Sequence, residues 1–350
     1  MARRPSRSLT RKFHDLTETY EPKLRDALRQ AMDNVTDGAD YQAVVRALIA
    51  NDIEAAMRAL NISAAAFRPF DVSVTEAFEA AGRSAVSDMP IIKGPSGAKI
   101  TFRFDVRHPV VERRLQSQIT GRIQGMTSEM EGVARSVLTQ GLAEGRNPRR
   151  TASRLMGVIN PATGKREGGL LTLASNQVDW VDRARAELES GDAAALRRFL
   201  TRTRRDRRFD RAVEKAISGQ QSLSQEQIEK ILNRYSDRLL RSRAEMVART
   251  ETTEALNSGK RSSYAQMADE TGTDPNEAIK GWMATRDNRT RDQHVAMNGI
   301  QVTGLDTPFT MPDGSQMMHP CDSSLGAGAS QTAGCRCTFW VRLNYMARAA

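Results

Sequence analysis

The chain has 350 residues, of which 39% are hydrophobic and only 5% aromatic. This length predicts two or three domains, and the scarcity of aromatic residues argues against a β-sandwich. The formal net charge of +10 is carried mainly by arginine and indicates an anionic partner, nucleic acid or an acidic protein. Three cysteines, two of them one residue apart, exclude a disulfide scaffold. The chain has no apolar run long enough for a signal peptide or a membrane span, so we expect a soluble protein made in the cytoplasm.

The first hundred residues have a helical pattern. Leu, Ala, Val and Met recur every three or four residues in 21–35 and 41–63, which is typical of amphipathic helices, and 71–89 predicts a further helix. Gly and Pro at 94–97 predict a turn before a strand-like alternation over 99–106. We therefore place a module boundary near residue 100.

The middle of the chain is also helical. Residues 110–145 have a helical pattern, a Gly-rich loop or hairpin is expected over 157–180, and helix resumes from Trp180 to Leu200. Ser224 and Gln227 fit a capping box that opens a long helix. One face of this helix is predicted to be apolar: Ile228, Ile231, Leu232, Tyr235 and Leu239.

The predicted fold class is mainly α with a small α+β C-terminal module, after extended multi-helix N-terminal and middle regions. Three modules are expected. They are an N-terminal helical region (1–100), a middle helical region with the Gly-rich loop and an Arg-rich run (101–245), and a C-terminal module (246–350) with short strands from about residue 278.

The last sixty residues gather most of the soft metal ligands of the chain. Cys335 and Cys337 are close enough in sequence to bind one ion, and zinc prefers four Cys or His ligands in a tetrahedron. His294 and either Cys321 or His319 would complete this set. Two interpretations stay open: a structural zinc that holds a small module together, or reduced thiols without a metal. A catalytic zinc is not predicted, because no neighbouring general base can be identified.

Two other constellations have both a catalytic and a structural interpretation. Residues 285–294 combine Arg, Asp and His, which suits a hydrolase site or an ion-paired loop that anchors the module. Glu251 and Glu254 lie three residues apart on a predicted helix, which suits a divalent cation or a salt-bridged helix face. We favour the structural interpretation in both cases. The sequence also lacks the GxxxxGK, G-x-S-x-G and HExxH signatures of common enzyme classes.

An arginine-rich run could contact phosphates without reading a base sequence. Contact with DNA, contact with an acidic protein and simple solvation all stay open for it. The run contains eight arginines: Arg197, Arg198, Arg202, Arg204, Arg205, Arg207, Arg208 and Arg211.

The C-terminal third contains four short motifs in a fixed order, namely VARTET, W…T.D.RTR..H…NG, F…PDG and CRCT. In their order and spacing they resemble the phage Mu F-like minor head protein family, also called phage head morphogenesis proteins. The similarity extends upstream to about residue 100. The motif positions that match are Arg249, Glu251, Trp282, Asp287, Arg291 and His294, together with Cys335 and Cys337. Members similar to this chain usually have a small residue at the position of Cys321, which ranks Cys321 and His319 below the other three ligands.

The resemblance implies a non-catalytic minor capsid protein of a tailed phage or prophage-like particle, present in several copies. It implies a place in the virion, at the head interior or portal, after assembly in the host cytoplasm and without a membrane. The implied partners are the portal protein, the major capsid protein or both, and phage DNA bound non-specifically. The implied roles are head assembly, DNA packaging and DNA ejection. The alternatives are a metal-dependent enzyme acting on nucleic acid and a DNA-binding protein packaged with the genome.

Overall fold

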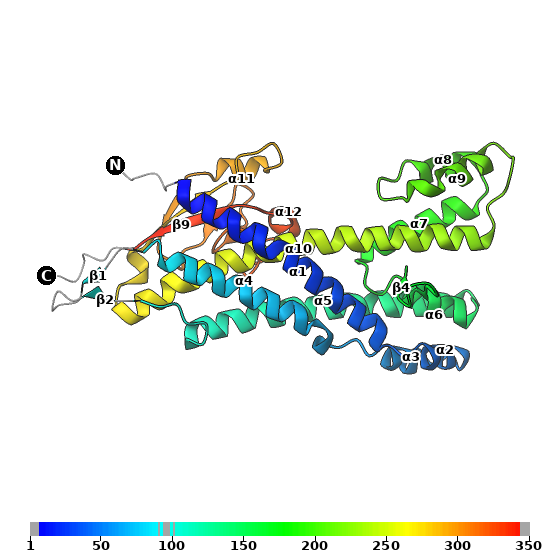
Figure 1. Cartoon of the computed structure of the whole chain (residues 1–350), viewed down its shortest axis with the longest axis horizontal. Coiled ribbons are helices and arrows are strands. Elements are labelled where there is room, and N and C mark those ends of the chain that lie inside the picture. Colours follow the sequence, from blue (N-terminus) through cyan, green and yellow to red (C-terminus); the bar gives the residue numbers. More distant parts are fainter. Residues whose placement is uncertain (1–6, 90–91, 94–98, 101, 344–350) are drawn as a thin grey trace. The chain divides into compact units, whose positions relative to one another are not determined.

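The computed structural model describes residues 7–89, 92–93, 99–100 and 102–343 of the chain. The described part is mostly helical with small antiparallel sheets, which confirms the predicted fold class (Figure 1). The α-helices are α1 (Arg7–Gly38), α2 (Tyr41–Ile49), α3 (Ile53–Leu60), α4 (Arg68–Val86), α5 (Pro109–Ala143), α6 (Pro148–Met156), α7 (Ser175–Glu189), α8 (Ala193–Leu200), α9 (Asp210–Ile217), α10 (Gln225–Thr271), α11 (Asp292–Ala296) and α12 (Ala329–Thr332). Short 3₁₀ turns are η1 (Ala64–Phe67), η2 (Arg207–Phe209) and η3 (Pro275–Glu277).

The strands form four small antiparallel sheets among the described residues. Three of these sheets are two-stranded hairpins, and the fourth has the strand order β6-β5-β9. The strands are β1 (Ile92–Lys93), β2 (Lys99–Ile100), β3 (Val158–Ile159), β4 (Arg166–Glu167), β5 (Ile279–Met283), β6 (Gln301–Thr303), β7 (Phe309–Thr310), β8 (Gln316–Met317) and β9 (Thr338–Arg342).

The chain divides into two compact units, each built from segments that are distant in sequence. Unit 1 contains Met1–Leu28, Pro69–Gly121 and Glu245–Ala350, and unit 2 contains Arg29–Arg68 and Arg122–Ala244. These units describe packing, and the three sequence modules remain a prediction.

Helix α10 contributes residues to both units. Its predicted capping box is confirmed, because Ser224 N–H donates to Oε1 of Gln227 at 2.9 Å and Gln227 N–H donates to Oγ of Ser224 at 3.2 Å. The predicted apolar face is also confirmed, since all five of its members are buried: Ile228, Ile231, Leu232, Tyr235 and Leu239.

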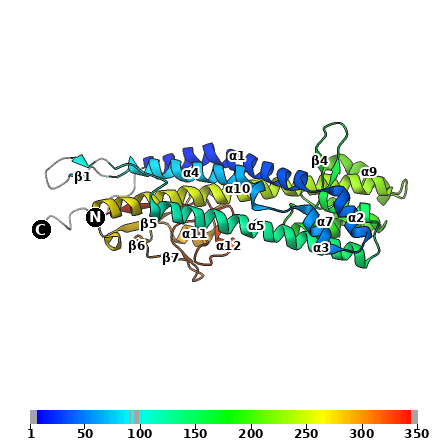
Figure 2. The same ribbon diagram turned by 90° about the horizontal axis from the view of Figure 1, so that it is seen from below.

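In unit 1 the C-terminal half of α10 packs closely on α4 and on the first turns of α5, and Figure 2 shows the three helices side by side. A Cβ atom at Gly259 would lie 2.1 Å from the carbonyl oxygen of Phe78, so only glycine permits this approach of α10 to α4. Ser258 Oγ donates to Oε1 of Gln118 at 2.9 Å and joins α10 to α5.

The C-terminal part of unit 1 has its own small core around the sheet β6-β5-β9. Trp282 of β5 lies opposite Phe339 of β9, and both are fully buried. The rest of this core consists of methionine, alanine and cysteine side chains and one phenylalanine: Met297, Phe309, Met311, Met317, Cys321, Ala327, Cys335 and Cys337. The candidate metal ligands therefore belong to the core of the module.

In unit 2 short helices pack on one another, with α2 against α3 and α6. Asp40, Asp52 and Asp192 cap α2, α3 and α8, and each carboxylate accepts from a backbone N–H three residues on. Helix α8 packs on both α7 and α9. The predicted hairpin is the pair β3–β4, and Gly168 N–H just after it donates to Oδ1 of Asp237 on α10 at 2.7 Å.

One strand prediction is only partly right. Of the segment 99–106, β2 covers Lys99–Ile100, and the described residues from Phe102 to Asp105 form no strand. The reason is a competing partner, because the side-chain amide of Gln266 accepts from Asp105 N–H at 3.0 Å and donates to the carbonyl of Arg103 at 3.2 Å. The turn predicted at 94–97 lies outside the described residues.

No helix in the described part of the chain combines the length and apolar character that crossing a bilayer requires.

Candidate functional site

His294, Cys335 and Cys337 form a buried cluster of potential metal ligands. Helix α11 carries the histidine, and the loop before β9 carries both cysteines. Nδ1 of His294 lies 3.7 Å from Sγ of Cys335 and 3.5 Å from Sγ of Cys337, and all three ligand atoms lie within 4.8 Å of one another. A tetrahedral zinc with bonds of about 2.0–2.3 Å separates its ligands by roughly 3.5 Å. The described cluster is therefore close to the spacing that zinc requires.

The ring of His294 is oriented by a second hydrogen bond. Its Nε2 lies 3.0 Å from Oε1 of Gln331. The amide nitrogen of Gln331 donates to Asp313 and Gln293, so its oxygen faces the histidine and Nε2 must carry the proton. Nδ1 is thus directed at the two thiols, which is the arrangement in which an outer partner prepares a histidine for a metal. The edge of the Trp282 ring packs against the imidazole at a centroid distance of 5.6 Å.

Cys321 is adjacent to this cluster. Its Sγ lies 3.3 Å from the carbonyl oxygens of both Thr250 and Thr332, and its single S–H can donate to either. A hydrogen bond with Cys321 also raises the pKa of the Cys335 thiol, and burial raises this pKa further. Cys321 has a φ of 73°, a strained value for a residue with a side chain. Strained backbone of this kind is often found at binding sites.

His319 has a different environment from the cluster. Its ring stacks on Phe339 at a centroid distance of 6.1 Å, and its Nδ1 lies 3.1 Å from the carbonyl oxygen of Pro320. Burial lowers the pKa of His319 to about 4, so the ring is neutral at physiological pH. These contacts engage one ring nitrogen and one ring face, and neither His319 nor Cys321 belongs to the described group of ligand atoms that lie within 4.8 Å of one another.

The ion-paired residues of 285–294 hold the cysteine loop in place. Asp287 pairs with Arg336, the residue between the two cysteines, and this contact holds the pKa of Asp287 well below its usual range. Arg291 donates to the carbonyl of Ala333. Thr285 Oγ1 donates to the carbonyl of Arg336 at 2.6 Å. The described contacts of this segment therefore fix the loop that carries the two cysteines.

A buried polar face of helix α10 also binds the loop that carries the cysteines. Thr253 Oγ1 donates to the carbonyl of Cys335 at 2.8 Å, and Asn257 Nδ2 donates to the carbonyl of Cys337 at 2.9 Å. Thr250 Oγ1 accepts from the N–H of Gly334 at 2.8 Å. The sequence patterns did not predict these residues as part of the site. The signal was a helical segment with threonine, asparagine and serine where apolar residues would be expected.

The other motif residues are also embedded in contacts. Arg249 pairs with Glu21 of α1 at 3.0 Å, and Trp282 is fully buried. Glu251 and Glu254 are at most 7% exposed. Among the described residues these two carboxylates do not belong to a cluster of three potential metal ligands, so a divalent cation there has no structural support.

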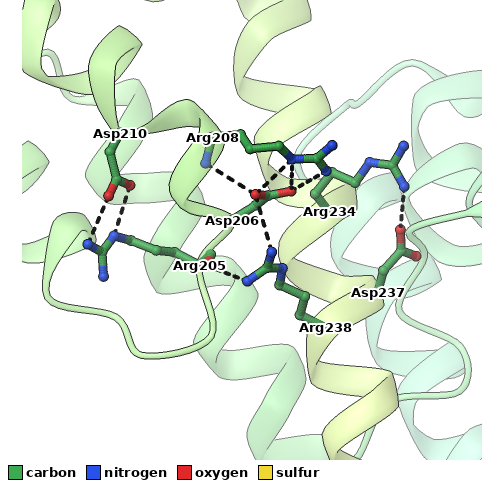
Figure 3. Close-up of polar contacts among 7 residues, drawn as sticks. All are labelled: Arg205, Asp206, Arg208, Asp210, Arg234, Asp237 and Arg238. Atoms are coloured by element: carbon green, nitrogen blue, oxygen red, sulfur yellow. Dashed lines mark hydrogen bonds and ion pairs between the residues drawn. The ribbon is translucent and has the colours of Figure 1, made fainter.

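The arginine-rich run contains a buried aspartate in unit 2, which one arginine of the run and one of α10 contact (Figure 3). Asp206 is 3% exposed and accepts hydrogen bonds from Arg208 and from Arg238 of α10. Arg238 also donates to the carbonyl of Arg205 at 3.0 Å, while the Arg205 guanidinium binds Asp210 through two hydrogen bonds of 2.9 Å. Part of the run is thus structural.

By its fold this is a mainly helical protein with a small α+β module that contains the cysteine and histidine cluster. A comparison with known families shows which family the chain belongs to. Residues 133–340 match the model described as Phage Mu protein F like protein. The chain therefore belongs to the Phage Mu protein F-like family, a family of phage head morphogenesis proteins. A search of curated proteins and a search of solved structures each found no match.

Proposed function

We propose that this chain is a minor structural protein of the head of a tailed phage or prophage-derived particle. In this role it associates with the portal, the capsid interior or both, and acts in head assembly, DNA packaging or DNA delivery without catalysis. The observation that carries the proposal is the family match over 133–340, which includes every motif residue from Arg249 to Cys337.

The contacts of the motif residues support a structural role. Asp287 and Arg291 bind the loop that carries the cysteines, and Arg249 binds α1. His294 is only 1% exposed, so a substrate would have to displace core side chains to reach it. A general acid or base needs direct or water-mediated contact with its substrate.

The proposed role of the cysteine and histidine cluster is to hold a structural zinc ion. His294, Cys335 and Cys337 would supply three ligands, and Cys321 would supply the fourth. Two further properties support this assignment: the cluster is closed to solvent, and its module has a small core built largely from methionine, alanine and cysteine. Such a module gains much of its folding free energy from a bound metal.

The place in the head is tested by quantitative mass spectrometry of purified particles from the phage or prophage that encodes the chain. A few to about a dozen copies per particle would be expected of a portal-associated or interior minor protein, since closed ring symmetry limits the number of equivalent sites. Absence from mature particles would contradict the proposal. Nuclease assays on the purified chain would then test the enzyme alternative.

The metal is tested by elemental analysis of the purified chain. One zinc per chain, reduced to none by His294→Ala or Cys337→Ser, is the expected result. Cys321→Ser decides the fourth ligand, since it should weaken zinc binding without abolishing it. A fully folded, zinc-free chain that does not take up added zinc would contradict the assignment.

A further inference from the structure

The eight arginines between Arg197 and Arg211 fall into two classes by their contacts. Three of them are ion-paired with carboxylates: Arg202, Arg205 and Arg208. The other five have exposed side chains, and none of these side chains makes an ion pair or hydrogen bond with a described residue: Arg197, Arg198, Arg204, Arg207 and Arg211. We refer to these five as the free arginines.

The ion-paired class fixes the backbone from which the free arginines extend. Arg202 Nε donates to Glu187 of α7 at 2.7 Å, and Arg205 joins the loop to Asp210 at the start of α9. Asp206 joins the same loop to α10, as Figure 3 shows. The backbone that carries the free arginines is therefore fixed by ion pairs at several points. Little ordering of the backbone is then needed when a ligand binds.

Three of the free arginines lie on the solvent-facing sides of α8 and α9, and Arg204 lies in the exposed turn between α8 and η2. Helix α8 buries Leu196 and Phe199, whereas Arg197 and Arg198 are exposed. Helix α9 buries Val213 and exposes Arg211.

Within the segment 197–211 no carboxylate compensates the positive charge of the free arginines. The segment 197–211 contains two carboxylates, Asp206 and Asp210, and both are already bound by the paired arginines. A stable partner for five such guanidinium groups must supply several negative charges. Phosphate groups suit arginine well, because the planar guanidinium can donate two parallel hydrogen bonds to one phosphate.

We propose that the free arginines form a surface that binds the phosphate backbone of double-stranded DNA without reading its sequence. An acidic protein is the less suitable partner, because protein interfaces need a buried apolar or aromatic centre. Within the described structure, no exposed large hydrophobic side chain lies between residues 193 and 217. Single-stranded nucleic acid is also less suitable, since bases would need exposed aromatic rings on which to stack. The inference does not depend on the place of the chain in the head.

The test measures binding of the full chain to a mixed-sequence 30-base-pair duplex by fluorescence anisotropy at several salt concentrations. Each phosphate contact contributes about 0.9 to the steepness of log K against log salt. Replacing all five free arginines with glutamine should weaken binding at least about tenfold at low salt and make the slope shallower by up to about 4.5. The fold should be unchanged, since these side chains have no partners.

A matched variant separates this surface from the net charge of the chain. It replaces five other exposed arginines of unit 2 that also lack ion pairs: Arg46, Arg58, Arg68, Arg149 and Arg150. This variant loses the same charge and should retain most of the affinity and the salt slope.

Three outcomes would overturn the inference. The first is the absence of duplex binding at low salt. The second is an equal loss of binding in the two five-arginine variants, which would assign binding to net charge. The third is a preference for poly-glutamate over DNA of equal charge, which would assign the surface to an acidic protein.

Discussion

Nε2 of His294 and Oε1 of Gln331 lie 3.0 Å apart, and this hydrogen bond decides which ring nitrogen faces Cys335 and Cys337. Gln331 lies on α12, a four-residue helix in the segment between β8 and β9. It has no ligand atom suited to zinc, yet it sets the tautomer and the orientation of the histidine that would bind the metal.

The first prediction concerns this outer contact. Gln331→Met should lower the zinc affinity of the chain about 10–100-fold, because the imidazole loses the acceptor that orients it. Competition with a chromophoric chelator measures this affinity. Gln316→Met is the control, since Gln316 is exposed and its side chain has no described contact with Gln331 or His294. Equal affinities of wild type and Gln331→Met would show that the hydrogen bond has no role in metal binding.

The second prediction compares two glycines in helices. Gly259→Ala should destabilise the protein by about 2 kcal/mol or more, because the new methyl group would meet the backbone of Phe78 and force overpacking. Gly125→Ala should instead stabilise it by about 0.5–1 kcal/mol, since α5 leaves open space there and alanine is the better helix former. Urea unfolding measures both variants. Effects of the same sign would contradict the close approach of α10 to α4.

The third prediction concerns the polar face of α10. Asn257 is fully buried, and its side chain binds the carbonyls of Pro320 and Cys337 and the hydroxyl of Thr338. Asn257→Leu removes the side-chain donor to the Cys337 carbonyl and the acceptor of the Thr338 hydroxyl, and should lower the free energy of unfolding by about 2–4 kcal/mol.

Asn288, which is exposed, provides the control for this substitution. Asn288→Ala should change stability by no more than about 0.5 kcal/mol. A neutral Asn257→Leu variant would mean that the cysteine loop does not depend on α10.

The fourth prediction concerns pH and a buried lysine. Lys280 is fully buried, and burial, helped by the nearby charge of Arg261, lowers its pKa to about 7. Its Nζ donates to the carbonyls of Leu305 and Met318, while Asp306 and Asp322 oppose the shift and Arg114 adds to it. The unfolded chain, with a lysine pKa near 10.4, therefore binds more protons than the folded chain between about pH 7 and pH 10.

The sign of the pH effect follows from this difference. The free energy of unfolding should rise from pH 7 to pH 10, with a contribution from this lysine of at most about 1.4 kcal/mol per pH unit. Lys280→Met should flatten the rise when urea unfolding is measured across this range. A wild-type stability that falls throughout, or an unchanged slope in Lys280→Met, would contradict the lowered pKa.

The fifth prediction concerns Asp206, which joins the loop that carries the free arginines to α10. Asp206→Ala leaves Arg208 and Arg238 without their shared carboxylate and should destabilise unit 2 by about 1–3 kcal/mol. Arg208 holds the pKa of Asp206 at about 2, so its stabilisation is present above about pH 4 and is lost as the pH falls to 2. Hydrogen exchange of residues 201–217 in wild type and variant measures the local loss. The five free arginines, replaced together, should leave this exchange unchanged.

Periodicity and short-range chemistry made much of the helical fold predictable. The capping box at Ser224 and the apolar face of α10 depend on neighbours three or four residues apart, so the chain encodes them locally. The strand predicted over 99–106 was only partly right, because Gln266 is more than a hundred and fifty residues away and competes for the backbone of Arg103 and Asp105. A sequence pattern over a few residues cannot indicate a hydrogen-bond partner so distant in the chain.

The sequence by itself determined the composition of the candidate site. A Cys-x-Cys pair, one histidine and the surrounding motifs stand in the chain, and their order led to the Phage Mu protein F-like family. Only the tertiary structure decided which ligands meet. It brings Nδ1 of His294 to both thiols, places Cys321 beside Cys335 and gives His319 other contacts. The structure also shows which residues of the arginine-rich run are ion-paired with carboxylates and which are the free arginines. The ligands lie on segments far apart in the chain, and only the packing of α10 and α11 against the sheet places them together. The bound arginines are those that reach Glu187, Asp206 and Asp210 in the folded chain.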